Sequence, residues 1–229
     1  MAANARHSSE NSEFMTPQWL TDWSHYVMGG IDLDPASCEA ANRTVRAEKI
    51  FTKVENGLFQ EWRGRCWINP PGGLVDECGR EVIRKSKKRP GCTESGACGL
   101  PPGHKHSGVE SSAVFWWHKL VHEFEAGRVA CAMFLGFSLE VLQSAQGFAG
   151  KQPLDFPCSL PKQRIKFETE VDGVRVQAAD PTHANVIVLV MRGAPELPLG
   201  DQHSNALQMI ERFKTTFSQI GYVHVPRGY

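Results

Sequence analysis

The stretch Cys66–Gly73, which reads "CWINPPGG", decides how this chain folds. Three apolar residues are followed at once by Asn69, two prolines and two glycines. Proline fixes φ and removes a backbone donor, whereas glycine permits close backbone approaches that other residues forbid. The stretch therefore predicts a buried strand that ends abruptly and leaves Asn69 and the carbonyl groups beside it facing outward.

A second strand with an unusual polar ending is predicted at Ile31–Asp34, which stops at Pro35. A helix over 16–27 precedes it, with Thr16 as N-cap and Pro17 as the first helical residue, and Gly29 and Gly30 end it. Ligands in open α/β sheets bind beyond the carboxyl ends of the strands. If the two strands are neighbours in one sheet, their polar endings face the same crevice.

The rest of the chain continues the alternation of helix and strand. We expect further helices over 38–47, 111–127, 138–145 and 205–221, strands over 49–52, 128–136 and 184–191, and a β-hairpin turning at Asp172-Gly173 within 164–180. This order predicts an α/β fold with a central, mostly parallel sheet and a β-hairpin region near the C-terminus. A length of 229 residues favours a single domain over 14–229, after a flexible polar N-terminus over 1–13.

Composition narrows the class of protein. The formal net charge is zero, which argues against a generally basic nucleic-acid binder, although one basic face remains compatible with it. No apolar run approaches the length of a membrane span, and the polar start lacks the apolar core of a secretory signal. Seven cysteines without an export signal favour a reducing compartment. We therefore expect a cytoplasmic protein without membrane segments.

The alternation of helix and strand is interrupted over 74–112, where we expect a long inserted loop after the Asn-Pro-Pro motif. Its cysteines and histidines are residue types that suit a structural zinc: Cys78, Cys92, Cys98, His104 and His106. Their spacing matches no common zinc finger, and a flexible loop with free thiols is the alternative. Its basic run favours phosphate contact over a solvated charge run: Arg84, Lys85, Lys87, Lys88 and Arg89.

Three motifs in this order carry a family resemblance: Thr16-Pro17, Asp34-Pro35-Ala36-Ser37 and Asn69-Pro70-Pro71. Together with "TPQWL", "GGIDLDPAS", "ANRTVRA", "NGLFQEWRGRCWINPPGG" and "FWWHKL", they resemble the phage-associated DNA N6-adenine methyltransferases. The resemblance covers roughly residues 14–167. Because it depends on the order and spacing of several motifs, it is more specific than a lone tripeptide.

The resemblance implies a Rossmann-like class I methyltransferase fold that uses S-adenosylmethionine and acts on double-stranded DNA in a bacterial cell. Methyl transfer requires the planar exocyclic amine of adenine to become tetrahedral, and the rigid acceptors of Asn69, Pro70 and Pro71 would favour that change. Strand alternation places Asp32 and Asp34 on one side, where they can converge on one ligand. The expected cofactor contacts are Thr16, Pro17, Asp32, Asp34, Pro35, Ala36, Ser37 and Asn56.

The chain departs from the family pattern at two places. Gly72 stands where an aromatic residue usually follows the two prolines, and "SCEAAN" replaces the glycine-rich turn after Asp34-Pro35-Ala36. A flipped target base needs a stacking surface. Trp116 and Trp117 are candidates for it, with core packing as the alternative for both.

Other functions remain open from the sequence. The same acceptors serve cytosine-N4 methylation, although enzymes of that type more often carry Ser-Pro-Pro, and RNA or protein-glutamine methylation is a more distant alternative. The departures also leave room for a catalytically inactive DNA-binding relative. A palindromic target would favour a homodimer.

Overall fold

The fold is described from a computed structural model over residues 15–71, 74–76, 109–136, 139–147, 150–171, 174–177 and 183–229. The N-terminus predicted to be flexible, 1–13, lies outside these ranges. So does most of the predicted insertion, 77–108.

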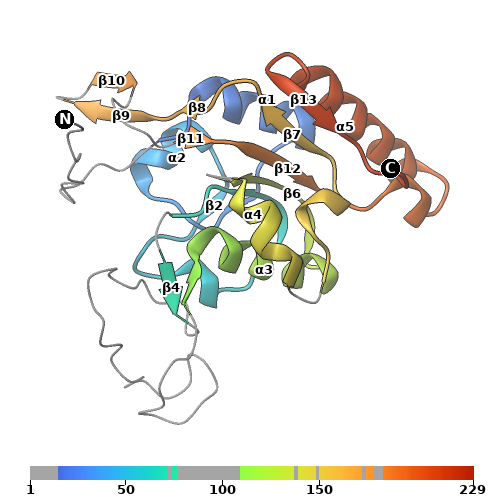
Figure 1. Cartoon of the computed structure of the whole chain (residues 1–229), viewed down its shortest axis with the longest axis horizontal. Coiled ribbons are helices and arrows are strands. Elements are labelled where there is room, and N and C mark those ends of the chain that lie inside the picture. Colours follow the sequence, from blue (N-terminus) through green and yellow to red (C-terminus); the bar gives the residue numbers. More distant parts are fainter. Residues whose placement is uncertain are drawn as a thin grey trace, which may run out of the picture.

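A seven-stranded sheet forms the centre of the molecule, in the order β13-β7-β12-β6-β3-β1-β2 (Figure 1). Its strands are β1 (Leu33–Asp34), β2 (Lys49–Ile50), β3 (Gly64–Ile68), β6 (Val129–Gly136), β7 (Cys158–Pro161), β12 (Val186–Val190) and β13 (Gly221–His224). The pairs β2–β1, β1–β3 and β3–β6 are parallel, and β12 and β13 run against the other strands. The predicted α/β class with a mostly parallel central sheet is confirmed, and the sheet is compatible with a Rossmann-like fold.

Helices cover both faces of the sheet (Figure 1). One face carries α1 (Gln18–Met28), α2 (Glu39–Val45) and α5 (Asp201–Phe217), and the other carries α3 (Ser112–Glu125) and α4 (Glu140–Ser144). Side chains along β3 alternate between the two cores, because Cys66 and Ile68 pack with α3 whereas Trp67 packs with α1 and α5. The two-sided burial explains the nearly continuous apolar sequence of β6.

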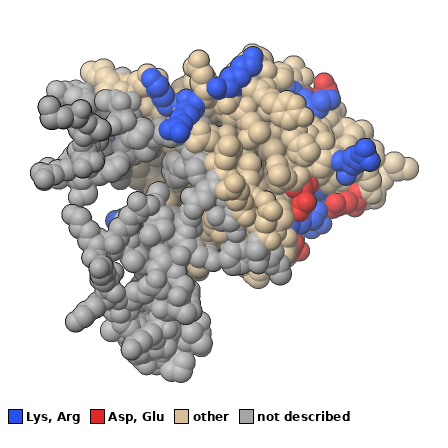
Figure 2. Space-filling model, in the orientation of Figure 1, with Lys and Arg blue, Asp and Glu red and all other residues tan. Residues whose placement is uncertain are grey.

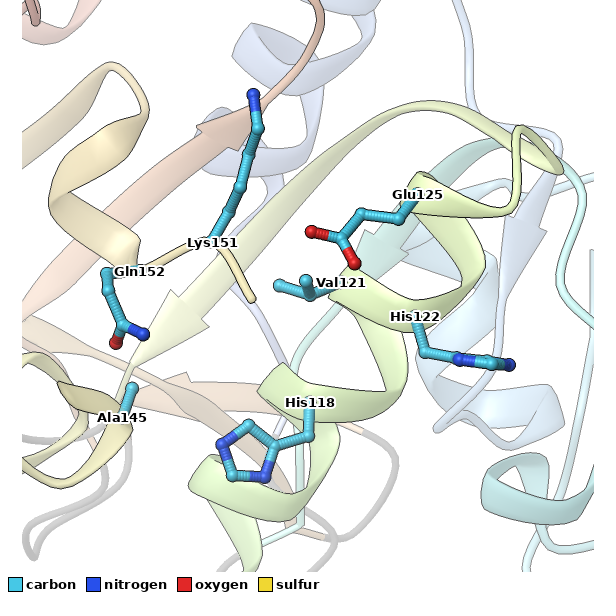
Figure 3. Close-up of a pocket in the computed structure, with 7 residues that line it drawn as sticks. All are labelled: His118, Val121, His122, Glu125, Ala145, Lys151 and Gln152. Atoms are coloured by element: carbon cyan, nitrogen blue, oxygen red, sulfur yellow. The ribbon is translucent and has the colours of Figure 1, made fainter. Parts of the chain in front are cut away.

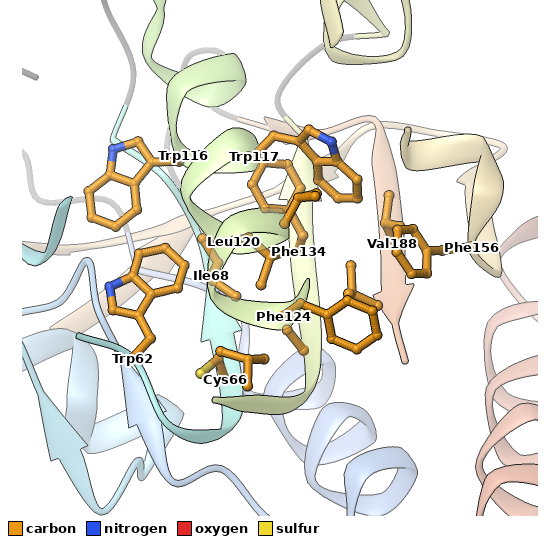
Figure 4. Packing of buried hydrophobic residues seen from close by; sticks show 14 of the residues in the cluster. Trp62, Cys66, Ile68, Trp116, Trp117, Leu120, Phe124, Phe134, Phe156 and Val188 are labelled. Atoms are coloured by element: carbon orange, nitrogen blue, oxygen red, sulfur yellow. The ribbon is translucent and has the colours of Figure 1, made fainter. Parts of the chain in front are cut away.

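Aromatic rings dominate the core beneath α3 (Figure 4). Trp117 is fully buried and meets Phe134 and Phe156 edge to face, at centroid distances of 5.2 and 5.9 Å. Trp116 stacks on Trp62 at 5.6 Å. Such pairs add to the area that the rings already remove from water, so this layer holds α3 firmly against β3 and β6.

Three short antiparallel ribbons lie outside the central sheet. They pair β9 (Glu168–Val171) with β10 (Val174–Gln177), β8 (Ile165–Lys166) with β11 (His183–Ala184), and β4 (Leu74–Asp76) with β5 (Val109–Ser111). The hairpin predicted around Asp172-Gly173 is therefore confirmed. The segment predicted to be an irregular loop over 74–112 begins and ends in paired strands instead, so β4 and β5 close its base.

The start of the first helix differs from the prediction. Helix α1 begins at Gln18 with Pro17 as its N-cap, and no side chain caps it, so Thr16 is not the cap. Proline in that position supplies the extended φ and ψ that a cap requires, which leaves the Thr16 hydroxyl available elsewhere. Gly29 ends the helix as predicted, in the left-handed conformation with φ 76°.

Two strands at one end of the sheet had not been predicted, the edge strand β13 and its neighbour β7. Single-turn 3₁₀ helices complete the described chain at η1 (Gly57–Phe59), η2 (Ala145–Gly147), η3 (Pro153–Asp155) and η4 (Ala194–Glu196). Among the helices of the described ranges, none combines the length and the apolar character that crossing a bilayer would require.

Candidate functional site

The two polar strand endings lie at the switch point of the sheet, between two neighbouring strands whose following connections run to opposite sides. From β1 the chain passes through α2 to β2 on one side, whereas β3 is followed by β6 on the other. Strands β1 and β3 are parallel neighbours, with Leu33 opposite Cys66. Ligands in open α/β sheets bind at such a switch point, so Asp34 and Asn69 emerge at the edge where a ligand is expected.

Asn69 offers an acceptor that nothing in the described chain uses. Its side chain is partly buried, and its Nδ2 donates a long hydrogen bond of 3.5 Å to Oγ1 of Thr16. Its Oδ1 is inaccessible to solvent and has no hydrogen-bond partner among the described residues. A buried acceptor without a partner costs folding free energy, so this oxygen is suited to a donor that arrives with a ligand. Pro70 is buried and Pro71 exposed.

Asp34 is the second polar group at this edge. The residue is only 2% exposed, and its Oδ1 accepts a hydrogen bond of 3.1 Å from the backbone N–H of Ala36. Burial raises the pKa of this carboxyl to about 7, against the smaller, opposing effects of the Ala36 N–H and the Ser37 side chain. No cation of the described ranges contributes to this shift. A ligand with hydroxyl or ammonium donors would add to the compensation that these two groups give.

Asp32 does not join Asp34, which corrects the expectation that both converge on one ligand. Its carboxylate accepts hydrogen bonds from the Arg65 backbone N–H at 2.7 Å and from Arg65 Nε at 3.0 Å, and it pairs with the guanidinium. The Arg65 hydrogen bond holds the pKa of Asp32 below its usual value. Arg65 lies near the start of β3, whereas Asn69 follows its end, so Asp32 is held toward the opposite edge of the sheet.

The loop after β2 packs beside the Asp34-Pro35 turn. Asn56 caps η1, because its Oδ1 accepts a hydrogen bond of 3.2 Å from the Leu58 N–H. Gly57 lies against the Pro35 carbonyl, and its own carbonyl accepts a hydrogen bond of 2.8 Å from Nε1 of the buried Trp62. The loop is therefore fixed next to Pro35, as the predicted cofactor role of Asn56 requires, although the Asn56 oxygen is already used within the loop.

Gly57→Ala is expected to lower the free energy of unfolding by about 1–3 kcal/mol, the usual cost of forcing atoms into a packed site. A Cβ at this position would lie 1.9 Å from the Pro35 carbonyl oxygen, so either the loop or the Asp34-Pro35 turn must move. Urea unfolding of the variant measures this. Gly127→Ala serves as the control, because a Cβ there meets no atom within 4 Å, although its φ of 75° still carries backbone strain. A loss at Gly57 no larger than that at Gly127 would contradict the close packing.

The remaining motif, Thr16-Pro17, reaches the same edge through an interaction that the sequence did not predict. Met15 and Glu168 pair as an antiparallel bridge, with N···O distances of 2.8 and 2.9 Å between their backbones. Thr16 and Pro17 are both buried behind this bridge, and Thr16 contacts Asn69. Strand β9 therefore holds the entrance of α1 beside the Asn-Pro-Pro motif. A backbone bridge between residues this far apart leaves no signal in a single sequence.

Trp116 and Trp117 do not supply the predicted stacking surface. Trp116 is 4% exposed and Trp117 is fully buried, because both pack in the core beneath α3. Neither ring presents a face to a base in this arrangement. The alternative considered for them, core packing, is the one observed, and the reason is that α3 needs large apolar side chains to cover β3 and β6.

The predicted DNA contacts over 84–89 and the predicted zinc ligands Cys78, Cys92, Cys98, His104 and His106 lie outside the described residues. Within the described ranges, no cluster of three or more His, Cys, Asp or Glu side chains could hold a metal ion. Cys66, Cys131 and Cys158 are buried thiols, and Cys38 is a partly buried thiol whose Sγ accepts a hydrogen bond from the Ala41 N–H.

A small cavity of about 130 Å³ lies away from the switch point, between α3 and the segment that precedes η3 (Figure 3). His118, His122 and Glu125 line it from α3, and Lys151 and Gln152 from the opposite side. In Figure 3 the Glu125 carboxylate turns toward Val121 while His122 points away, so the two histidines do not converge on one point. The cavity therefore shares no residue with the group formed by Asp34, Asn69 and Thr16.

Comparison of the chain with protein-family models, with curated proteins and with solved structures finds no match in any of the three.

Proposed function

We propose that this chain is a DNA amino-methyltransferase that transfers a methyl group from S-adenosylmethionine to N6 of adenine in duplex DNA. The observation that carries the proposal is the buried, unpartnered Oδ1 of Asn69 at the switch point of the sheet. An oxygen in that position would accept an N–H from a bound molecule. Many molecules carry such an N–H group. We choose adenine in DNA because the three motifs stand in the order typical of the DNA N6-adenine methyltransferases that the sequence resembles.

The chemistry explains why an amide acceptor suffices. The lone pair of an aromatic amine is delocalised into the ring, and an acceptor that binds its N–H favours the tetrahedral geometry in which the nitrogen can attack. Asn69 need not remove the proton before attack, so a neutral side chain serves. Pro70 and Pro71 restrict the backbone that carries the acceptor, and the geometry is thereby set before the transition state.

The residues beside Asp34 fit the methyl donor, which supplies an electrophilic methyl group on a sulfonium. Asp34 would bind a hydroxyl or the ammonium of the donor, which would compensate its buried charge. Ala36 and Ser37 are small enough to let the donor approach the backbone. The loop around Asn56 and Gly57 would border the donor from the side of β2, and Thr16 and Pro17 from the side of β3.

One assay tests the proposal. Unmethylated duplex DNA is incubated with the purified chain and methyl-labelled S-adenosylmethionine, and the modified nucleoside is identified after digestion. N6-methyl-2′-deoxyadenosine is the expected product. N4-methyl-2′-deoxycytidine would move the chain to the cytosine-specific alternative. Donor or DNA binding without transfer would favour the inactive relative, and absence of transfer together with absence of donor binding would reject the proposal.

A further inference from the structure

Three exposed cations lie on the segment that leads from β7 to the hairpin. Lys162, Arg164 and Lys166 are exposed. Between them and just beyond, Ile165 is 6% exposed and Phe167 is 1% exposed. The alternation fixes which side faces the core, so Arg164 and Lys166 point outward together. We call these three residues the basic stripe.

The stretch Ser159–Phe167 carries these cations and no acidic residue, and Glu168 and Glu170 follow it. Figure 2 shows two groups of Lys and Arg atoms at the upper left of the described surface, over the region where Figure 1 places β8 and α1. In a chain of zero net charge, such a run of cations gives its part of the surface a local positive potential.

The basic stripe is tied to the candidate site by a short series of contacts. Lys166 stands two residues before Glu168, whose backbone pairs with Met15. Met15 is followed by Thr16, whose Oγ1 accepts the 3.5 Å hydrogen bond from Asn69. The cations therefore approach the edge of the sheet at which Asn69 emerges, from the side of the hairpin and not from that of β4 and β5.

We propose that the basic stripe binds the sugar–phosphate backbone of the duplex whose target base reaches Asn69. This inference rests on the proposed function and assigns it a DNA contact outside the predicted insertion. Residues two apart on an extended segment are roughly 6.6–6.8 Å apart, so Arg164 and Lys166 lie about one such step apart, and Lys162 precedes them at the bend that follows β7. Lys and Arg that neutralise phosphates release condensed counterions, which makes the contact salt-dependent and independent of sequence.

The test is the salt dependence of binding to a fluorescent duplex of mixed sequence. In the triple variant K162Q/R164Q/K166Q, the slope of log K against log[salt] should become shallower by about 2–3, because each phosphate contact contributes about 0.9. Affinity near 0.15 M salt should fall by about tenfold or more. The kcat at saturating DNA should stay near wild type, since no residue of the stripe touches Asn69 or Asp34, whereas the KM for DNA rises.

A matched control separates position from net charge. The variant R63Q/K214Q/R227Q loses the same three charges from exposed positions elsewhere, and its slope should stay within 1 of wild type. An unchanged slope in the stripe variant, or an equal change in both variants, would overturn the inference. So would a stripe variant that loses affinity for anionic lipid vesicles but keeps its affinity for DNA.

The failure of the inference can be told apart from failure of the proposed function. If the wild type methylates DNA and the stripe variant binds it normally, only the inference falls. If the wild type neither methylates nor binds DNA, both fall.

Discussion

Asn69→Ala is expected to lower kcat for methyl transfer by about 10²–10³-fold, the usual effect of removing one preorganised polar group from a transition state. The free energy of unfolding should change much less than the rate of methyl transfer. The Oδ1 of Asn69 has no partner in the described chain, and its only described hydrogen bond, to Thr16, is 3.5 Å long. The free energy of unfolding should therefore stay within about 1 kcal/mol of wild type or rise above it, because an unsatisfied buried acceptor is removed. Single-turnover kinetics and urea unfolding measure the two quantities.

Asn69→Asp is the matched variant, because it keeps an acceptor oxygen at the same place. It should retain transfer well above the level of the alanine variant. Equal loss in both would mean that the amide acts through its Nδ2 and the Thr16 hydroxyl instead. An alanine variant that transfers methyl groups at the wild-type rate would remove the basis of the proposed function.

Asp34→Asn is expected to weaken binding of the methyl donor by about 10–100-fold, because hydrogen bonds to a charged group contribute about 1.5–3 kcal/mol. The affinity of the wild type should rise with pH up to about 7. The buried carboxyl is protonated below that pH, and only the carboxylate attracts an ammonium or accepts two donors. The affinity of the variant should lack this dependence. Calorimetric titration with S-adenosylmethionine between pH 5.5 and 8 measures both.

The same substitution has an opposite effect on stability in the absence of donor. The folded-state pKa of Asp34 is raised above its unfolded value, so the folded protein holds a proton that the unfolded chain releases between about pH 4 and pH 7. The wild type therefore loses unfolding free energy as pH rises through this window, by up to about 1.4 kcal/mol per pH unit. Asp34→Asn should lose less, and should exceed the wild type in stability most clearly at pH 8.

Asp32→Asn is the control for both effects. Its pKa is lowered by Arg65, so its stabilising contribution is present above its unfolded pKa and is lost as pH falls toward its folded value. Donor affinity should be unchanged in this variant. An equal loss of donor affinity at Asp32 and Asp34 would mean that the substitutions act through β1 as a whole.

The sequence was informative where burial dictates a pattern. The apolar run of β6, the pairing of β9 with β10 and the Asn-Pro-Pro ending of β3 each have a local cause, and each was predicted. Strands β7 and β13 had no such signal, because a short strand such as "CSLP" or "GYVH" gains its pairing only from the neighbours it meets in space.

The candidate site was predicted in part for the same reason. Strand alternation was the basis for expecting Asp32 and Asp34 to converge, but alternation does not indicate which charged residue lies opposite, and Arg65 binds Asp32. A Trp-Trp pair in an amphipathic helix likewise does not reveal which elements it will cover. Asp34 and Asn69 were accessible to prediction because Asp34 is the last residue of β1 and Asn69 directly follows β3, so their positions depend on strand order alone.

The bridge between Met15 and Glu168 has a consequence for how the protein matures. Contacts between residues distant in sequence form late, since a long loop must close before they contribute stability. The entrance of α1 is held by a strand that leaves the ribosome only after most of the chain, so a nascent polypeptide ending before Phe167 would contain Asp34 and Asn69 without the arrangement that holds Thr16 against Asn69. Competence to bind the donor should thus appear late in synthesis, as the last step of assembly of this edge.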